Sequence, residues 1–177
     1  ALLTDSIADL PQEYIDNNQI HVIPLNIDIE GSTFLDKASI NNEILFSIID
    51  DLKVFPTSSQ PTIKLVKQRL QFLKEKYESI IIITVSAELS GTWNVFKTVS
   101  EELKTEGVKV SLIDSCLNSG AQGLLVMEAV EMIKNNLSHD EIVKKIEDLK
   151  KKTKIYVSVS DFNFMVRGGR VSPLKGK

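Results

Sequence analysis

Residues 80–92 read IIIITVSAELSGT, and this stretch decides the predicted fold because β-branched residues give way abruptly to a short, hydroxyl-rich turn. Ile80 to Val85 shows no polar alternation, which is typical of a strand buried on both faces of a parallel sheet. Ser90 is the predicted N-cap of a following helix. That helix carries apolar side chains at helical spacing: Trp93, Phe96, Val99 and Leu103. The stretch therefore predicts a central strand, a tight turn and an amphipathic helix.

The start of this helix has features of a site for a negatively charged group. Ser90 and Thr92 bring hydroxyl groups, and Gly91 lets a ligand approach the backbone closely. The first N–H groups of a helix lack internal acceptors, and the helix dipole favours an anion beside them. A plain helix cap explains the same residues, and both interpretations stay open at this point.

Strands and helices alternate along the chain, which predicts an α/β fold with a mainly parallel sheet and helices on both faces. The predicted strands other than 80–85 are 2–3, 22–29, 108–113 and 155–159, and the predicted helices are 11–18, 39–52, 63–77, 92–103, 118–134, 138–151 and 161–167. Pro24 interrupts the second strand region, as expected at a sheet edge. The helix at 118–134 is apolar almost all round, so it should lie deep against the sheet, with Gly120 and Gly123 permitting close approach.

Polar residues cluster where these strands end. They are Asp5 and Ser6, Ser86 and Ser90, Asp114 and Ser115, and Ser160 and Asp161, with Ser58 and Ser59 ahead of a helix. Ligands of such sheets bind beyond the carboxyl ends of the strands. The set is rich in hydroxyls and poor in bases, which favours binding of a small anionic head group.

Several short motifs occur in a specific order along the chain. They are Thr4-Asp5-Ser6, Ala8-Asp9-Leu10-Pro11, Val22-Ile23-Pro24-Leu25, Ser58-Ser59-Gln60-Pro61, Leu89-Ser90-Gly91-Thr92, Asp114-Ser115 and Arg167-Gly168-Gly169-Arg170-Val171-Ser172. Over its whole length the chain resembles the DegV family, bacterial fatty-acid-binding proteins that present fatty acid to a fatty acid kinase. One departure is Ser58, where the family usually has threonine; the hydroxyl is kept and the methyl group is lost.

The resemblance implies a lipid-binding carrier subunit and not an enzyme. It implies that the carboxylate of a long-chain fatty acid is held by the hydroxyls of Ser58 and Ser90, while the acyl chain enters an apolar tunnel. The full set of predicted ligand-binding residues is Ser58, Ser59, Ser90, Gly91, Thr92, Asp5, Ser6, Asp114 and Ser115. No catalytic residue, metal or cofactor other than the bound fatty acid is predicted.

The resemblance also implies a domain organisation. Residues 1–165 are expected to form the N-terminal domain of the family's EDD fold, and residues 166–177 a Gly-Gly-Arg linker. The linker is expected to lead to a second α+β domain that is largely missing from this chain. The basic residues of this segment, Arg167, Arg170, Lys175 and Lys177, suit either a phosphate site or a solvated linker.

Composition narrows the classes of function. A net charge of −3 and a pI near 5.5 argue against a nucleic-acid partner. No run approaches the roughly 20 apolar residues of a membrane helix, so a cytoplasmic location is expected. Cys116 is the single cysteine, and the histidines are His21 and His139, which gives no metal-ligand cluster. Cys116 could be a catalytic thiol at a helix start, although a buried, inert cysteine is the interpretation we favour.

The competing class is a doubly wound α/β enzyme acting on a small phosphorylated or carboxylated metabolite. Asp5 and Asp114 could form a carboxylate pair for acid–base work, but Asp at strand ends also braces loops and caps helices. The motifs G-x-G-x-x-G, G-x-x-x-x-G-K-[ST] and G-x-S-x-G do not occur in the sequence. Nucleotide binding through a phosphate loop and serine hydrolysis are therefore disfavoured.

Overall fold

A four-stranded parallel sheet forms the centre of the protein in the computed structural model, which describes residues 1–158, 166 and 169. The strands are β1 (Leu2–Asp5), β2 (His21–Ile23), β6 (Ser79–Thr84) and β7 (Lys109–Asp114), in the order β2-β1-β6-β7. In β6, Ile83 lies opposite Thr4 of β1 and Ile113 of β7. The predicted central strand is thus confirmed, and it lies between two other strands of the sheet.

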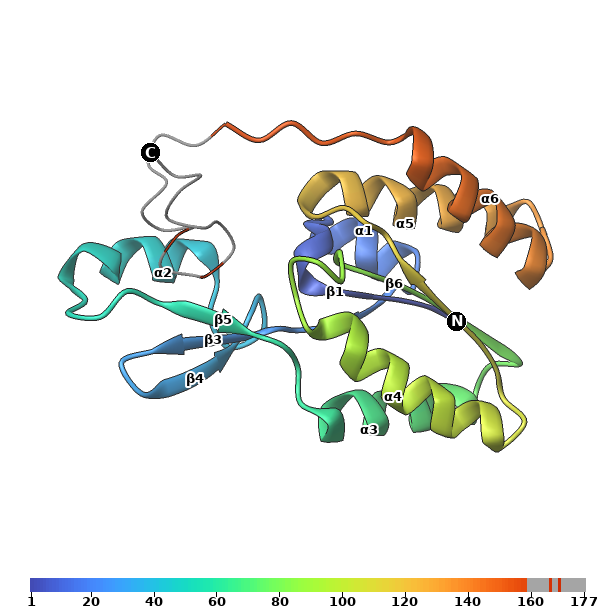
Figure 1. The fold of residues 1–177 in the computed structure, drawn as a ribbon, viewed down its shortest axis with the longest axis horizontal. Coiled ribbons are helices and arrows are strands. Elements are labelled where there is room, and N and C mark those ends of the chain that lie inside the picture. Colours follow the sequence, from blue (N-terminus) through green and yellow to red (C-terminus); the bar gives the residue numbers. More distant parts are fainter. Residues whose placement is uncertain (159–165, 167–168, 170–177) are drawn as a thin grey trace.

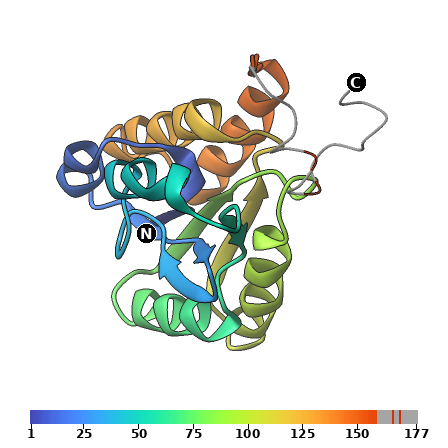
Figure 2. The ribbon, with the colours of Figure 1, turned by 90° about the vertical axis from the view of Figure 1, so that its left-hand side faces the viewer.

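Helices cover both faces of this sheet (Figures 1 and 2). One face carries α1 (Gln12–Asn17), α5 (Ser119–Lys134) and α6 (His139–Lys152), and the other carries α3 (Ile63–Lys74) and α4 (Thr92–Thr105). Ile81 and Ile83 pack in the first core, and Ile80 and Ile82 pack in the second. Successive side chains of a strand point to opposite faces, so a continuous isoleucine run fills two cores at once.

Residues 26–59 form a separate unit, here called the small lobe, at the left of Figure 1. Its antiparallel strands are β3 (Asn26–Ile29), β4 (Ser32–Leu35) and β5 (Thr57–Ser59), in the order β4-β3-β5, and its helices are α2 (Asn42–Ile48) and η2 (Ile49–Asp51). Glu30 and Gly31 join β3 to β4 with φ values of 46° and 85°. Positive φ at both positions suits a tight hairpin turn. Residues 1–23 and 63–152 are called the body.

Two boundaries differ from the sequence prediction. The strand region 22–29 is in fact two strands, β2 in the parallel sheet and β3 in the small lobe, because Pro24 has no N–H group for a ladder. Helix α4 begins at Thr92 with Gly91 as its N-cap, so the predicted cap at Ser90 is displaced by one residue. Helix α6 begins with a capping box formed by Ser138 and Glu141, in agreement with the helix predicted from residue 138.

The strand predicted at 155–159 is wrong for residues 155–158, which are described and belong to no strand. Tyr156 is 93% exposed and Val157 is 64% exposed. A β-branched sequence forms a strand only when a neighbouring strand accepts its backbone hydrogen bonds, and none of the described strands pairs with this segment. Val159, Ser160, Asp161 and the basic residues Arg167, Arg170, Lys175 and Lys177 lie outside the described residues, as does nearly all of the helix predicted at 161–167.

Helix α5 lies against the sheet as predicted, but only one of its two glycines is needed for close packing. A Cβ atom on Gly123 would lie 2.3 Å from the backbone oxygen of Ala8, whereas one on Gly120 would meet nothing within 4 Å. Leu124 on the outer side of the helix is exposed. Among the described residues, no helix is both long and apolar enough to span a membrane.

Candidate functional site

An open groove of about 540 Å³ lies where the small lobe meets the body. The lobe side of the groove comes from β5, and the body side comes from the turn before α4 and from the start of α3. The lining residues are Ser58, Ser59, Gln60, Pro61, Thr62, Ile63, Ser90, Gly91 and Val95. Two hydroxyl motifs that are distant in the sequence, Ser58-Ser59-Gln60-Pro61 and Ser90-Gly91, therefore meet in space.

The two serines of β5 have different roles because side chains alternate along a strand. Ser59 donates a hydrogen bond from Oγ to Oδ2 of Asp28 at 3.1 Å, so its hydroxyl is engaged inside the small lobe. Ser58 lies opposite Ile27 and is exposed. Its Oγ makes no hydrogen bond to any other part of the chain that the structure describes. Of the two hydroxyls, that of Ser58 is the one free to contact a ligand.

Ser90 is held in place at the start of α4. Its N–H donates to the carbonyl oxygen of Ser86 at 3.1 Å, and its Oγ accepts from the N–H of Thr92 at 3.2 Å. The Oγ atoms of Ser90 and Thr92 are 2.8 Å apart, and Thr92 is fully buried behind the groove. Thr92 thus supports the hydroxyl of Ser90. A helix of 14 residues begins here, and its dipole favours negative charge at this end.

Gly91 has a packing role that the sequence prediction did not include. A Cβ atom at this position would lie 1.7 Å from Oε1 of Gln60, so the missing side chain makes room for the Gln60 amide. The backbone carbonyl of Gln60 in turn accepts from Nδ2 of Asn26 at 2.8 Å. Gln60 was part of the quoted motif but was not among the predicted site residues. Its position between lobe and body makes it a further residue of the groove.

Asp5 and Ser6 are not among the residues that line this groove. Asp5 is fully buried, and its carboxylate accepts hydrogen bonds from the N–H of Val85 at 2.7 Å and from Nε2 of Gln122 at 3.1 Å. Ser6 is also buried, and its Oγ accepts from the N–H of Leu25 at 3.1 Å. These side chains connect β1 and the residue after it to the loop after β6, to α5 and to the segment that leads into the lobe.

Asp114 and Ser115 are likewise engaged in a loop outside the groove. Oδ1 of Asp114 accepts from the N–H groups of Ala87 at 3.2 Å and Cys116 at 2.9 Å. Ser115 is buried and exchanges hydrogen bonds with the backbone of Leu117. Because backbone N–H groups hold each carboxylate separately, the geometry favours loop bracing over an acid–base pair of Asp5 and Asp114.

Cys116 is exposed, which corrects the expectation that it is buried. Partial burial raises the pKa of its thiol, and the negative charge of Asp114 raises it further. A catalytic cysteine needs the opposite change, a lowered pKa, so the structure gives no support to that role. Among the described residues, no three His, Cys, Asp or Glu side chains form a group that could hold a metal ion.

The buried carboxyl of Asp5 predicts a pH effect on stability. Burial is the main cause that raises its pKa from 3.8 to about 6, against hydrogen bonds from Val85 and Gln122 that lower it. Since the folded pKa is the higher one, the stabilisation by this group is complete below about pH 4 and is lost as the pH rises through about 6. At about 1.4 kcal/mol per pH unit, the loss is about 3 kcal/mol.

The measurement is the free energy of unfolding by urea at pH 4 to 7.5, for the native chain and for Asp5→Asn. Asparagine cannot ionise but has only one acceptor oxygen, so the variant should be less stable at low pH. The advantage of the native chain should then shrink with rising pH. A constant difference over this range would show that Asp5 binds the same number of protons in the folded and unfolded chains, so that folding does not raise its pKa.

The sequence matches a known protein family over its whole length. The family model described as "Uncharacterised protein, DegV family" matches residues 1–177. The chain belongs to the DegV family. A DegV domain-containing protein of Staphylococcus aureus is 35% identical over 99% of this chain, and the protein DegV of Bacillus subtilis is 31% identical over 97% of it. The chain spans about 61% of the length of each of these relatives.

Solved structures of DegV proteins have the same fold. The structure of the fatty-acid-binding protein DegV from Bacillus subtilis has a TM-score of 0.88 and 29% identity, covering 97% of this chain and 61% of its own. A DegV-family protein from Thermus thermophilus, described for its fatty acid binding, has a TM-score of 0.86 and 26% identity, covering 96% and 59%. The predicted family and α/β fold are confirmed, and both of these solved DegV proteins are described by their binding of fatty acid.

Proposed function

We propose that this DegV-family chain binds a long-chain fatty acid by its carboxylate in the groove between Ser58 and Ser90. The observation that carries the proposal is the convergence of these two hydroxyls, one from the small lobe and one from the body, on a single groove. The names of the solved relatives, which describe fatty acid binding, support the choice of ligand.

The chemistry of the groove suits a carboxylate better than a neutral head group. Each carboxylate oxygen accepts about two hydrogen bonds, and charge-assisted bonds are the stronger ones. The hydroxyls of Ser58 and Ser90 can both donate toward the groove, and the start of α4 adds a favourable dipole. In this proposal the predicted residue Thr92 does not contact the ligand but holds the hydroxyl of Ser90 in place. Ser59 likewise has a supporting role, because its hydrogen bond to Asp28 fixes β5 against β3.

The acyl chain requires an apolar surface next to the carboxylate. Pro61, Ile63 and Val95 provide one in the groove, and Ile63 is 52% exposed. Each methylene transferred from water contributes about 0.8 kcal/mol, so a covering surface matters for affinity. We propose that the additional length of the family's longer members, arranged as a second domain, supplies this cover.

We further propose that the bound fatty acid is presented to a fatty acid kinase, a separate protein that forms the acyl phosphate. Phosphoryl transfer from ATP needs neutralised phosphates and an oriented acceptor. The sequence contains no phosphate loop for this work. A carrier that holds the carboxylate at an open groove leaves the ATP site to its partner, and a cytoplasmic location fits such a partner.

Two measurements test the proposal. Mass spectrometry of lipid extracted from purified protein is expected to find a long-chain fatty acid. Protein loaded with palmitate is expected to yield acyl phosphate from ATP only when a fatty acid kinase is added, and palmitate without the protein is the control. Acyl phosphate formed by the DegV protein alone would restore the enzyme interpretation, and the absence of any bound lipid would remove the binding proposal.

A further inference from the structure

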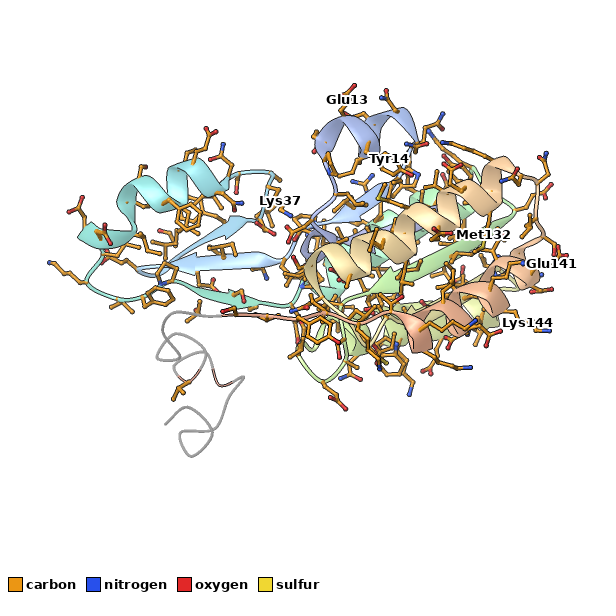
Figure 3. All side chains as sticks on the ribbon, turned by 90° about the horizontal axis from the view of Figure 1, so that it is seen from above. Glu13, Tyr14, Lys37, Met132, Glu141 and Lys144 are labelled. Atoms are coloured by element: carbon orange, nitrogen blue, oxygen red, sulfur yellow. The ribbon has the colours of Figure 1, made fainter. Side chains whose placement is uncertain are left out.

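A hydrogen-bonded cluster joins the small lobe to the body apart from the groove. Lys37 of the lobe donates from Nζ to the backbone oxygen of Ser6 at 2.7 Å and pairs with Oδ1 of Asp9 at 2.5 Å. Oδ2 of Asp9 accepts from Oγ of Ser119, the first residue of α5, at 2.7 Å. Figure 3 shows Lys37 at the boundary between the lobe and the body. These four residues, Ser6, Asp9, Lys37 and Ser119, are called the junction cluster.

The backbone of the junction cluster is unusual. Asp9, Lys37 and Ser119 have φ values of 49°, 60° and 49°, in the left-handed region that side chains with a Cβ disfavour. They are three of the seven non-glycine residues with positive φ in the described part of the chain. Such conformations cost of order 1 kcal/mol or more each and persist only where surrounding contacts enforce them. The junction is therefore held in one defined arrangement.

Further hydrogen bonds at the boundary of the lobe, in the part of the chain that the structure describes, lie at the two chain crossings. The chain passes between them through residues 24–25 and 60–62. At the first crossing, the N–H of Leu25 donates to Oγ of Ser6, the residue whose carbonyl receives Lys37. Lys37, just after β4, is thus bound to Ser6, the same residue that binds Leu25 where the chain enters the lobe. Any rotation about this entrance moves β5, and with it Ser58, relative to Ser90.

We propose that Lys37 is a positioning residue for the carboxylate groove. By binding Ser6 and Asp9 of the body, it fixes the orientation of the small lobe and holds Ser58 opposite Ser90. An exposed ion pair alone contributes little, but the bond from Nζ to the Ser6 carbonyl is partly buried and charge-assisted. The role of Lys37 in ligand binding rests on the proposed function, whereas its control of the lobe does not.

The first test measures lobe orientation without any ligand. Spin labels are placed at Ser47→Cys on the lobe and Thr98→Cys on α4, both exposed, in a Cys116→Ser background. Pulsed electron resonance then gives the distribution of label distances. Lys37→Met is expected to broaden or shift this distribution, and Lys37→Arg, which keeps both donations, is expected to restore it. Lys53→Met, at an exposed lysine of the same lobe, is the matched control and should change nothing.

The second test measures palmitate affinity by calorimetry for the same variants. Lys37→Met is expected to weaken binding by roughly 5- to 10-fold, with recovery in Lys37→Arg. Ser58→Ala should reduce palmitate affinity less in the Lys37→Met background than in the native chain. In that background the Ser58 hydroxyl is already displaced and contributes less to binding. A purely structural role would leave the effect of Ser58→Ala unchanged.

The outcomes separate the two proposals. If the native protein binds no palmitate, the proposed function fails, and the distance measurement still tests the control of the lobe by Lys37. If palmitate binds but Lys37→Met changes neither distances nor affinity, the positioning role is overturned. If Lys37→Met does not fold, Asp9→Asn removes the ion pair and keeps an acceptor for Ser119, and the same two measurements on that variant decide the question.

Discussion

Replacing Ser90 with alanine is expected to weaken fatty acid binding by roughly 10- to 150-fold. The lost interaction is a hydrogen bond from a hydroxyl to a charged carboxylate, worth about 1.5–3 kcal/mol, which converts to this range of affinity. Ser58→Ala is expected to have an effect of the same size, because its hydroxyl reaches the groove from the lobe. Calorimetric titration with palmitate gives the affinities directly.

Two controls make this result specific to the groove. Ser47→Ala removes an exposed hydroxyl that donates to the carbonyl oxygen of Ile44 within α2, so it should leave the affinity unchanged. Unfolding by urea checks the fold, since Ser90→Ala should cost about 1 kcal/mol through the lost bond to the N–H of Thr92. Native affinity in both Ser58→Ala and Ser90→Ala would mean that the carboxylate lies elsewhere.

The second large effect is expected at Gly123, where α5 contacts Ala8 in the segment that follows β1. An alanine Cβ would lie 2.3 Å from the backbone oxygen of Ala8, and a backbone atom cannot move aside as a flexible side chain can. Overpacking of this kind costs about 1–3 kcal/mol, and Gly123→Ala should fall in the upper part of that range. The free energy of unfolding by urea measures it.

Gly120 offers a matched control three residues earlier in the same helix. A Cβ atom there meets nothing within 4 Å, so Gly120→Ala should leave stability unchanged or raise it by up to about 1 kcal/mol through better helix propensity. Equal effects of the two substitutions would show that helix propensity, and not contact with Ala8, controls this position.

Elements with strong hydrophobic patterns could be predicted from the sequence. The isoleucines of β6 supply both cores, and α3, α4 and α6 have regular apolar stripes, so strand, helix and sheet type followed from periodicity. The groove residues Ser58 and Ser90 were also predicted, but from the resemblance to a family and from helix starts. Periodicity alone does not indicate that Ser58 lies in the small lobe, that Ser90 lies in the body, or that the two residues line one groove.

The small lobe could not be predicted in this way. β5 consists of Thr57, Ser58 and Ser59, all exposed, so no apolar alternation marks it as a strand. Its pairing with β3 depends on contacts between residues about 30 positions apart. Likewise, Asp5 and Asp114 look like ligand residues in the sequence, and only the acceptor roles of their carboxylates identify them as supports for loops. Lys37 carried no sequence signal at all.

The lobe also enters and leaves the body at nearly the same place. Asn26 and Ser59 are direct partners in the antiparallel sheet, and Nδ2 of Asn26 reaches the carbonyl of Gln60 at 2.8 Å. A segment whose two ends adjoin behaves as an insertion, since its interior can lengthen, shorten or change sequence while the path of the host chain stays the same. One side of the groove thus belongs to a single continuous segment, which could be exchanged as a unit provided that the contacts of Lys37 with the body are kept.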